Sequence, residues 1–137
     1  VIVVDALAFK RYCDIAKLLN KKMIIVTDND GDIQKNINDK YVEYLNDDNL
    51  IFVYEKDEAL NTIEPSVLEV NCEKDEPTET FREAISKKNS MKNKNKQEML
   101  EFMLNNKAEW ALRVFESEKK INYPEYIKNA IKQYNKS

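Results

Sequence analysis

Hydrophobic residues first occur as short continuous runs separated by amphipathic stretches. The runs lie at residues 1–4, 23–27 and 50–54 and are rich in β-branched side chains, which predicts strands that are buried on both faces. Between them, residues 8–19 and 33–45 place apolar side chains three or four positions apart, which predicts helices. Because helices connect the strands, we expect the strands to form a parallel sheet.

Beyond residue 55 the apolar segments become shorter and the loops longer. We expect a short helix that begins near Pro65, a loop, a second short helix, a strong helix or helix pair, and a last helix that begins at Pro124. We expect the loop at residues 73–80 and the second short helix at 80–86. The strong helix or helix pair is expected at 97–118 and the last helix at 124–134. Residues 87–96 are rich in lysine and asparagine and are the best candidate for a mobile segment.

This order of elements predicts an α/β fold, a Rossmann-like parallel sheet of about three strands flanked by helices, followed by a helical C-terminal part. We assign the sheet core to residues 1–72 and the helical part of the same domain to residues 73–137. With 137 residues, the chain can bury one core without disulfides. Its apolar runs fall far short of the roughly 20 residues that span a bilayer, so we expect no membrane partner.

The composition excludes several classes of catalytic site. The chain contains no histidine, which rules out Ser-His-Asp and Cys-His catalysis and histidine-ligated zinc. Its one glycine, Gly31, rules out a Walker loop and a GxGxxG fingerprint in this chain. Cys13 and Cys72 are too few for a disulfide framework and favour a reduced, cytoplasmic setting. Any chemistry here would therefore use carboxylates, lysines and a metal ion.

The charge is unevenly distributed along the chain. The net charge of −3 excludes a uniformly basic nucleic-acid binder, but acidic residues crowd positions 43–79 and lysines follow at 87–96. A domain that handles DNA through bound metal ions can be acidic overall, because its metal site must be acidic. The lysine-rich segment could contact the DNA backbone or form a solvated loop.

An acidic turn, DNDGD, follows the second expected strand. Asp28, Asp30 and Asp32 lie at the carboxyl end of this strand, where ligands gather in open parallel sheets. Side chains two positions apart on an extended segment point the same way, so Asp28 and Asp30 can converge on one hydrated Mg²⁺. Asp32 can be a further ligand or, as we prefer, the cap of the following helix. A solvated strand-to-helix turn without an ion is the alternative for all three.

The segment MIIVTDNDGD (residues 23–32) resembles the second motif of Toprim domains, the fold shared by topoisomerases, primases and related nucleases. Further segments are similar to segments of the overcoming-lysogenization-defect (OLD) family of ATP-dependent endonucleases, and they occur in the family's order. They are FKRYCDIAKL (residues 9–18), NTIEPS (61–66) and KAEWALRVFE (107–116). The resemblance implies that the chain is the C-terminal, Toprim fragment of such an endonuclease.

The resemblance implies a nuclease that cuts or nicks DNA with two Mg²⁺ or Mn²⁺ ions. By motif match, Asp28 and Asp30 would be metal ligands with Asp32 beside them, and Glu64 would be a further ligand or the support of the second ion. Lys107 would approach the scissile phosphate. Catalysis would thus depend on Lys107, Asp28 and Asp30.

The resemblance also implies partners and a missing part. In such proteins an ATPase domain precedes the Toprim domain in the same chain, and the family suggests a homodimer. Toprim domains open with a strand that carries a glutamate, and this sequence begins after that point. We therefore expect weak metal binding and no DNA cleavage by the isolated fragment.

The downstream candidates also have purely structural interpretations. Glu64 precedes Pro65, which favours an extended backbone that would aim the carboxylate across the strand ends; alternatively, it is an exposed acid at a helix start. The structural alternative for Lys107 is a lysine on a helix that is simply solvated. Arg113 could contact phosphate, but an ion pair with Glu109 is the preferred interpretation.

Two other classes of protein are alternatives to a nuclease. A non-catalytic, receiver-like regulatory α/β module would place its acidic residues after more than one strand, whereas here they follow a single strand. A Toprim module of a primase or topoisomerase would need a polymerase partner or a tyrosine nucleophile domain, neither of which is visible in the sequence. We therefore favour the nuclease interpretation.

Overall fold

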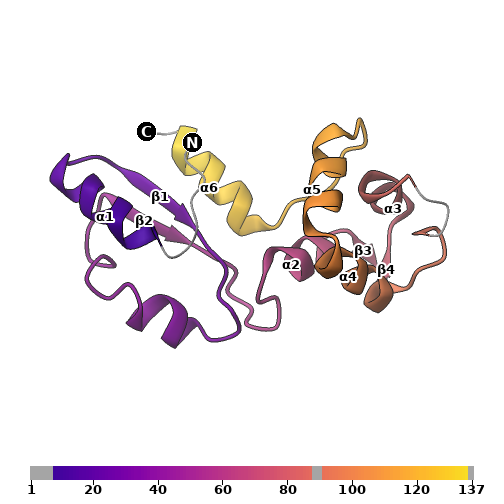
Figure 1. Ribbon diagram of the computed structural model, residues 1–137, viewed down its shortest axis with the longest axis horizontal. Helices are drawn as coiled ribbons and strands as arrows, with labels where there is room; N and C mark the ends of the chain where they lie inside the picture. Colours follow the sequence, from indigo (N-terminus) through magenta and orange to yellow (C-terminus); the bar gives the residue numbers. More distant parts are fainter. Residues whose placement is uncertain (1–7, 88–90, 136–137) are drawn as a thin grey trace. The chain divides into compact units, whose positions relative to one another are not determined.

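The chain is divided into two compact units (Figure 1). The computed structural model describes residues 8–87 and 91–135. The first unit comprises Val1–Thr62 together with Glu125–Ser137, and the second comprises Ile63–Pro124. The second unit is therefore an insertion in the sequence of the first, whereas the sequence pattern placed a boundary at residue 72. The division differs because the last helix packs on the sheet of the first unit.

The first unit contains a two-stranded parallel sheet, which confirms a mixed α/β fold and two of the expected strands. β1 (Met23–Val26) pairs with β2 (Leu50–Val53), with Met23 opposite Leu50 and Val26 opposite Val53. The remaining expected strand, at residues 1–4, lies outside the described residues. The sheet in the described part of the chain is thus smaller than the one of about three strands that the sequence predicted.

Successive side chains of a strand point to opposite faces of the sheet. Both faces of this sheet are apolar, and helices cover them. One core cluster joins the sheet to α1 (Phe9–Leu18) and to the segment after β1; its buried residues are Cys13, Ala16, Ile25, Tyr41, Tyr44 and Leu50. A second cluster joins the sheet to α6 (Glu125–Asn135); it contains Val53, Tyr126 and Ala130, with Ile24, Ile51 and Ile127 partly buried. Val26 departs from the expected burial, since it is 44% exposed.

The segment between the two strands is helical only in part. The sequence predicted one helix at residues 33–45, but the structure has a π-helix, η2 (Gln34–Asp39), followed by turns. Ile37 and Tyr41 are buried as expected. Their spacing of four positions fits a π-helix as well as an α-helix, so the apolar pattern does not separate the two.

The second unit is built from helices and one short hairpin. Its helices coincide with expected ones: α2 (Ile63–Glu69), α3 (Glu79–Ile85), α4 (Lys96–Asn105) and α5 (Lys107–Glu116). The hairpin of β3 (Cys72–Glu73) and β4 (Glu76–Pro77) replaces the loop expected at residues 73–80. Lys74 and Asp75 connect its strands with φ of 51° and 64°, the left-handed backbone that a tight two-residue hairpin turn requires.

A hydrophobic core holds the helices of the second unit together. Its buried residues are Val67, Leu68, Phe81, Ile85, Met91, Met99, Met103 and Trp110. Because α4 supplies Met99 and Met103 while α5 supplies Trp110, the strong helical segment is the helix pair that the pattern allowed.

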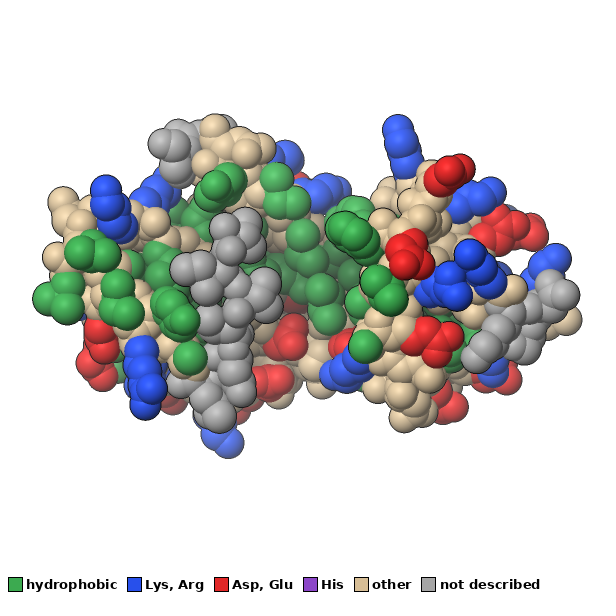
Figure 2. Space-filling view, turned by 45° about the horizontal axis from the view of Figure 1, so that its top comes forward, with side chains coloured by type: hydrophobic (Ala, Val, Ile, Leu, Met, Phe, Trp, Pro, Cys, Tyr) green, Lys and Arg blue, Asp and Glu red, His purple; other side chains and the backbone are tan. Residues whose placement is uncertain are grey.

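Hydrophobic side chains also reach the surface of both units (Figure 2). In the first unit Leu18 is 85% exposed, and in the second Phe115 is 88% exposed. Cys13 is buried as expected, and neither Cys13 nor Cys72 forms a disulfide. None of the helices in the described part of the chain combines the length and the apolar character needed to cross a membrane.

Candidate functional site

The acidic turn follows β1 and has a left-handed backbone. Asp28 is half-buried and Asp30 is exposed, and φ is 51° at Asp30 and 78° at Gly31. The premise that Asp28 and Asp30 point the same way on an extended segment does not hold, because Asp30 is left-handed. Gly31 makes the sharp turn expected of it, since glycine has no Cβ to oppose a positive φ.

Asp32 caps the helical segment that follows the turn. Its Oδ1 accepts a hydrogen bond from the backbone N–H of Lys35 at 2.9 Å, which is the bond that an N-cap side chain makes. The side chain of Glu58 accepts another N–H at this helix start, that of Ile33, at 2.7 Å. The preferred interpretation of Asp32 as a cap is confirmed, and one of its carboxylate oxygens is already in use.

A buried asparagine between the aspartates ties the turn to the loop after β2. Asn29 is 0% exposed. Its Nδ2 donates to the carbonyl oxygens of Glu55 and Asp57 at 2.9 and 3.1 Å, and its Oδ1 accepts from the N–H of Gly31 at 2.8 Å. Sequence reasoning missed this residue, although an asparagine two positions before a glycine is typical of an Asx-turn.

Glu64 is the second residue of α2 and is buried, with only 3% of its side chain exposed. The prediction of an extended backbone at Glu64, before Pro65, is wrong, because both residues lie in α2. The first turn of a helix accepts a proline, because the missing N–H would have no partner there. The alternative of an exposed acid is also wrong, although the start of a helix does favour the negative charge of Glu64.

Lys107 contacts Glu64 from the first residue of α5. Its Nζ lies 3.3 Å from Oε1 of Glu64, and 61% of the lysine side chain is exposed. The preceding junction is fixed by Asn106, whose Nδ2 donates to the carbonyl oxygen of Phe102 at 2.8 Å. A lysine at this end of a helix faces the positive end of the helix dipole, so the helix itself does not explain its presence.

The second carboxylate oxygen of Glu64, Oε2, is buried and has no hydrogen-bond partner in the described part of the chain. Leaving a buried polar atom unpaired costs about 1–3 kcal/mol, and more for a charged group. Native proteins keep few such atoms, and those that persist call for a specific reason such as a catalytic role or a bound ion. Glu64 Oε2 is thus a buried oxygen without a partner in the described part of the chain, a property that it shares with Tyr41 Oη and Trp110 Nε1.

The candidate residues fall into two groups. Asp28, Asp30 and Asp32 belong to the first unit, while Glu64 and Lys107 belong to the second and contact each other. Within residues 8–87 and 91–135, no three acidic, cysteine or histidine side chains are grouped as a metal site. A hydrated Mg²⁺ or Mn²⁺ needs only one or two protein carboxylates, because water and phosphate oxygens complete its shell.

Two basic features were candidates for DNA contact. Arg113 lies near a glutamate of its own helix, since its Nη1 is 3.7 Å from Oε2 of Glu116. The expected ion pair with Glu109 stays a prediction. Of the lysine-rich segment 87–96, residues 88–90 lie outside the described residues, so the expectation of a mobile segment is not tested there.

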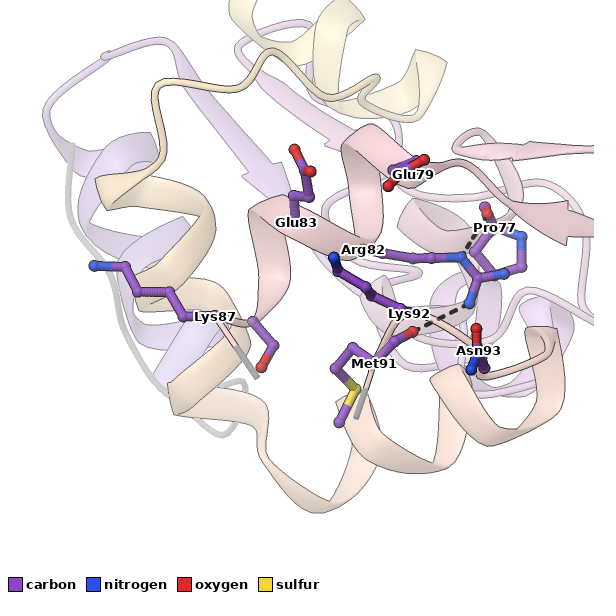
Figure 3. A pocket seen from close by; sticks show the side chains of 9 residues that line it. Pro77, Glu79, Arg82, Glu83, Lys87, Met91, Lys92 and Asn93 are labelled. Atoms are coloured by element: carbon purple, nitrogen blue, oxygen red, sulfur yellow. Dashed lines mark hydrogen bonds between the residues drawn. The ribbon is translucent and has the colours of Figure 1, made fainter. Parts of the chain in front are cut away.

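The second unit also contains a pocket of about 630 Å³ beside α3 (Figure 3). It is lined by Pro77, Glu79, Arg82, Glu83, Ser86, Lys87, Met91, Lys92 and Asn93. Arg82 is committed to the backbone, since its guanidinium donates to the carbonyl oxygens of Pro77 at 2.9 Å and Met91 at 3.2 Å. Side chains of both charges line the pocket, so the lining does not select a class of ligand.

In comparisons with known proteins, no family model, no curated protein and no solved structure matches this chain.

Proposed function

We propose that this chain is the Toprim-like module of a divalent-metal-dependent DNA nuclease, which hydrolyses phosphodiester bonds within an ATP-dependent endonuclease of the OLD type. Two features support the proposal. They are the acidic turn at the carboxyl end of β1 and the buried Glu64 in contact with Lys107. DNA is the proposed substrate, an ATPase domain of the full-length protein is the proposed partner, and a homodimer is the proposed assembly.

In this proposal Asp28 and Asp30 offer carboxylate oxygens to a hydrated Mg²⁺ or Mn²⁺ in the first unit, and Glu64 in the second unit offers Oε2 to an ion or orients its ligands. Such ions activate water as a nucleophile and stabilise the leaving oxygen in phosphodiester hydrolysis. The side chain of Lys107 is 61% exposed, so its ammonium group can contact a phosphate oxygen. There it would stabilise the negative charge that develops in the transition state.

The observation that carries the proposal is the unpaired Oε2 of Glu64. Removing a carboxylate from water is costly, and a structural ion pair offsets this cost only when hydrogen bonds satisfy its remaining lone pairs. Glu83 and Lys119 form an ordinary pair in the same unit, with 2.9 Å between Oε2 and Nζ and with side chains that are 43% and 56% exposed. The contrast supports a ligand-binding role for Glu64 and Lys107.

A plasmid-nicking assay on the full-length protein tests the proposal. Asp28→Ala, Glu64→Gln and Lys107→Met should each lower the rate of Mn²⁺-dependent nicking by about 100-fold or more, as the loss of a group that stabilises the transition state does. The matched control Glu83→Gln should leave the rate unchanged. Equal rates for Glu64→Gln and Glu83→Gln would remove Glu64 from the site, and a full-length protein that cuts no DNA with any divalent ion would refute the nuclease function.

The 137-residue chain by itself should bind Mn²⁺ weakly and leave DNA intact, because the proposal assigns one essential carboxylate to an upstream strand. Robust nicking by the isolated chain, abolished by EDTA and by Asp28→Ala, would support a nuclease but contradict that assignment.

A further inference from the structure

We infer that a water molecule bridges the indole N–H of Trp110 to Oε2 of Glu64, which makes Trp110 a positioning residue for this carboxylate. The inference rests on the proposed function for its consequence in catalysis, because it concerns the carboxylate on which that proposal depends. The bridge itself is a property of the second unit and can be tested without a metal ion or DNA.

Trp110 and Glu64 each bury a polar atom that has no partner, and the two atoms have opposite hydrogen-bonding roles. Within the described part of the chain neither Nε1 of Trp110 nor Oε2 of Glu64 has a hydrogen-bond partner, and the two residues are 5% and 2% exposed. The indole N–H can only donate, whereas an ionised carboxylate oxygen can only accept. Tyr41, whose Oη is also unpaired, belongs to the first unit. The donor and the acceptor of the second unit are thus complementary.

The two side chains extend into the same junction between α2 and α5. Nζ of Lys107 lies 3.3 Å from Oε1 of Glu64, and Trp110 follows Lys107 by three positions, which places both on one side of α5. Aromatic side chains on a helix point back toward its N-terminal end, so the indole extends toward the turn of Lys107. On α2, Val67 and Leu68 are one turn beyond Glu64, and both belong to the core cluster that contains the indole.

Water is the occupant that this pair of groups selects. A cation bound to Oε2 would leave the indole N–H unpaired, because that group has no lone pair to offer. An anion facing the indole N–H would be repelled by the carboxylate. A neutral group that both donates and accepts satisfies the two atoms at once, and buried waters typically bond to polar groups of this kind. Because water is neutral, the charge of Glu64 remains buried in its presence.

The bridge fixes the orientation of the Glu64 carboxylate. Lys107 contacts one carboxylate oxygen and the water holds the other, so rotation of the carboxylate is opposed from both sides. A carboxylate oxygen has more than one acceptor site, so Oε2 can bond to the water and still contact a further ligand. Partners of this kind raise the activity of a site by holding its reactive groups in place.

The indole signal in a ¹H–¹⁵N spectrum tests the bridge, because Trp110 is the one tryptophan of the chain. In the wild type the indole proton should show a rotating-frame Overhauser cross-peak to water, with the sign of a dipolar contact. Glu64→Gln should move this proton upfield, because the water then faces a neutral group and the bond from the indole weakens. The matched control is Glu69→Gln, which removes a charge from the same helix and an ion pair with Lys96, and it should leave the signal unchanged.

The bridge is overturned if the indole proton has no dipolar contact with water. It is also overturned if Glu64→Gln leaves the indole shift at its wild-type value, or moves it no further than Glu69→Gln does. Should Glu64→Gln not fold, Glu64→Asp replaces it, since it withdraws the carboxylate by one methylene group and should likewise move the indole proton.

Trp110→Phe in the full-length protein tests the positioning role, because it removes the N–H and keeps an aromatic ring in the core. Its kcat for Mn²⁺-dependent nicking should fall about tenfold, as the loss of an outer partner does, with KM unchanged. If the bridge is observed but Trp110→Phe cuts DNA like the wild type, the positioning role is overturned and the water bridge stands. A full-length protein that cuts no DNA overturns the proposed function and the positioning role together, while the spectra of the isolated chain still decide the bridge.

Discussion

Glu64→Gln should stabilise the second unit, although it removes an ion pair. The substitution keeps the shape of the side chain and removes the charge from a group that is 3% exposed and has an unpaired oxygen. Lys107 loses its partner, but 61% of its side chain is exposed, so water can solvate the ammonium group. The reverse change, Lys107→Met, leaves the buried carboxylate without its counter-charge and should destabilise the unit.

The sizes of both effects follow from the burial of the two partners. Removing a buried, unsatisfied charged atom relieves a cost of about 1–3 kcal/mol, and the glutamine amide retains part of it, so we expect a gain of about 1 kcal/mol. Breaking a fully buried pair costs about 3–5 kcal/mol, but the exposure of Lys107 screens this pair, so Lys107→Met should cost about 1 kcal/mol. For a unit of this size 1 kcal/mol corresponds to a shift of about 4–8 °C in the melting temperature.

Urea unfolding followed by the fluorescence of Trp110 measures these changes. Trp110 is the one tryptophan of the chain and is 5% exposed, and it belongs to α5, the helix that carries Lys107. In the Glu64→Gln background, Lys107→Met should have an effect near zero, because the two residues are coupled. A loss of about 1 kcal/mol or more in Glu64→Gln would refute the reasoning, since the pair would then be a stabilising structural contact.

Three further predictions concern pH, a turn and a buried arginine. The hydrogen bond to Asp14 and burial raise the pKa of Tyr44 from 10.0 to about 12. The bond's contribution to stability is therefore complete below pH 10 and is lost as the pH rises toward 12, and Asp14→Asn should reduce the pKa shift; tyrosinate absorbance, compared with Tyr44→Phe, checks this. Gly31→Ala should lower the stability of the first unit by about 1–2 kcal/mol, because φ is +78° there. Urea unfolding followed by circular dichroism measures the change, and an unchanged unfolding midpoint would contradict the prediction. Arg82→Lys should cost about 1–3 kcal/mol, because lysine cannot reach all of the carbonyl oxygens that the guanidinium contacts. Because Arg82 also holds the carbonyl oxygen of Met91, Arg82→Lys should speed cleavage after Lys92 by a lysine-specific protease. An unchanged cleavage rate would count against that role.

The helices and the parallel strand pair could be predicted because their signals are local. In α1, Cys13 and Ala16 are three positions apart and both face the core, and the apolar runs at β1 and β2 are typical of strands between covering layers. The hairpin turn at Lys74 and Asp75 could not be predicted, because neither residue is the glycine or asparagine that normally marks a left-handed turn.

The candidate site could be predicted only in its residue types. An acid before a proline is expected to be extended and exposed, whereas Glu64 is helical and buried because α2 packs it against the rest of its unit. Asn29 carries a local signal, the Asx-turn with Gly31, but its bonds to Glu55 and Asp57 join segments far apart in the sequence. Such long-range partners depend on tertiary packing, which a local pattern does not contain.

The insertion of Ile63–Pro124 into the first unit makes the order of synthesis differ from the order of assembly. All residues of the second unit leave the ribosome before α6, and domains fold as units while translation continues. Until α6 emerges, Ile24, Ile51 and Val53 lack the helix that packs against them. The nascent strands therefore carry an uncovered apolar face for the whole time that a neighbouring unit is being made, and in this interval they are most exposed to aggregation and to chaperones.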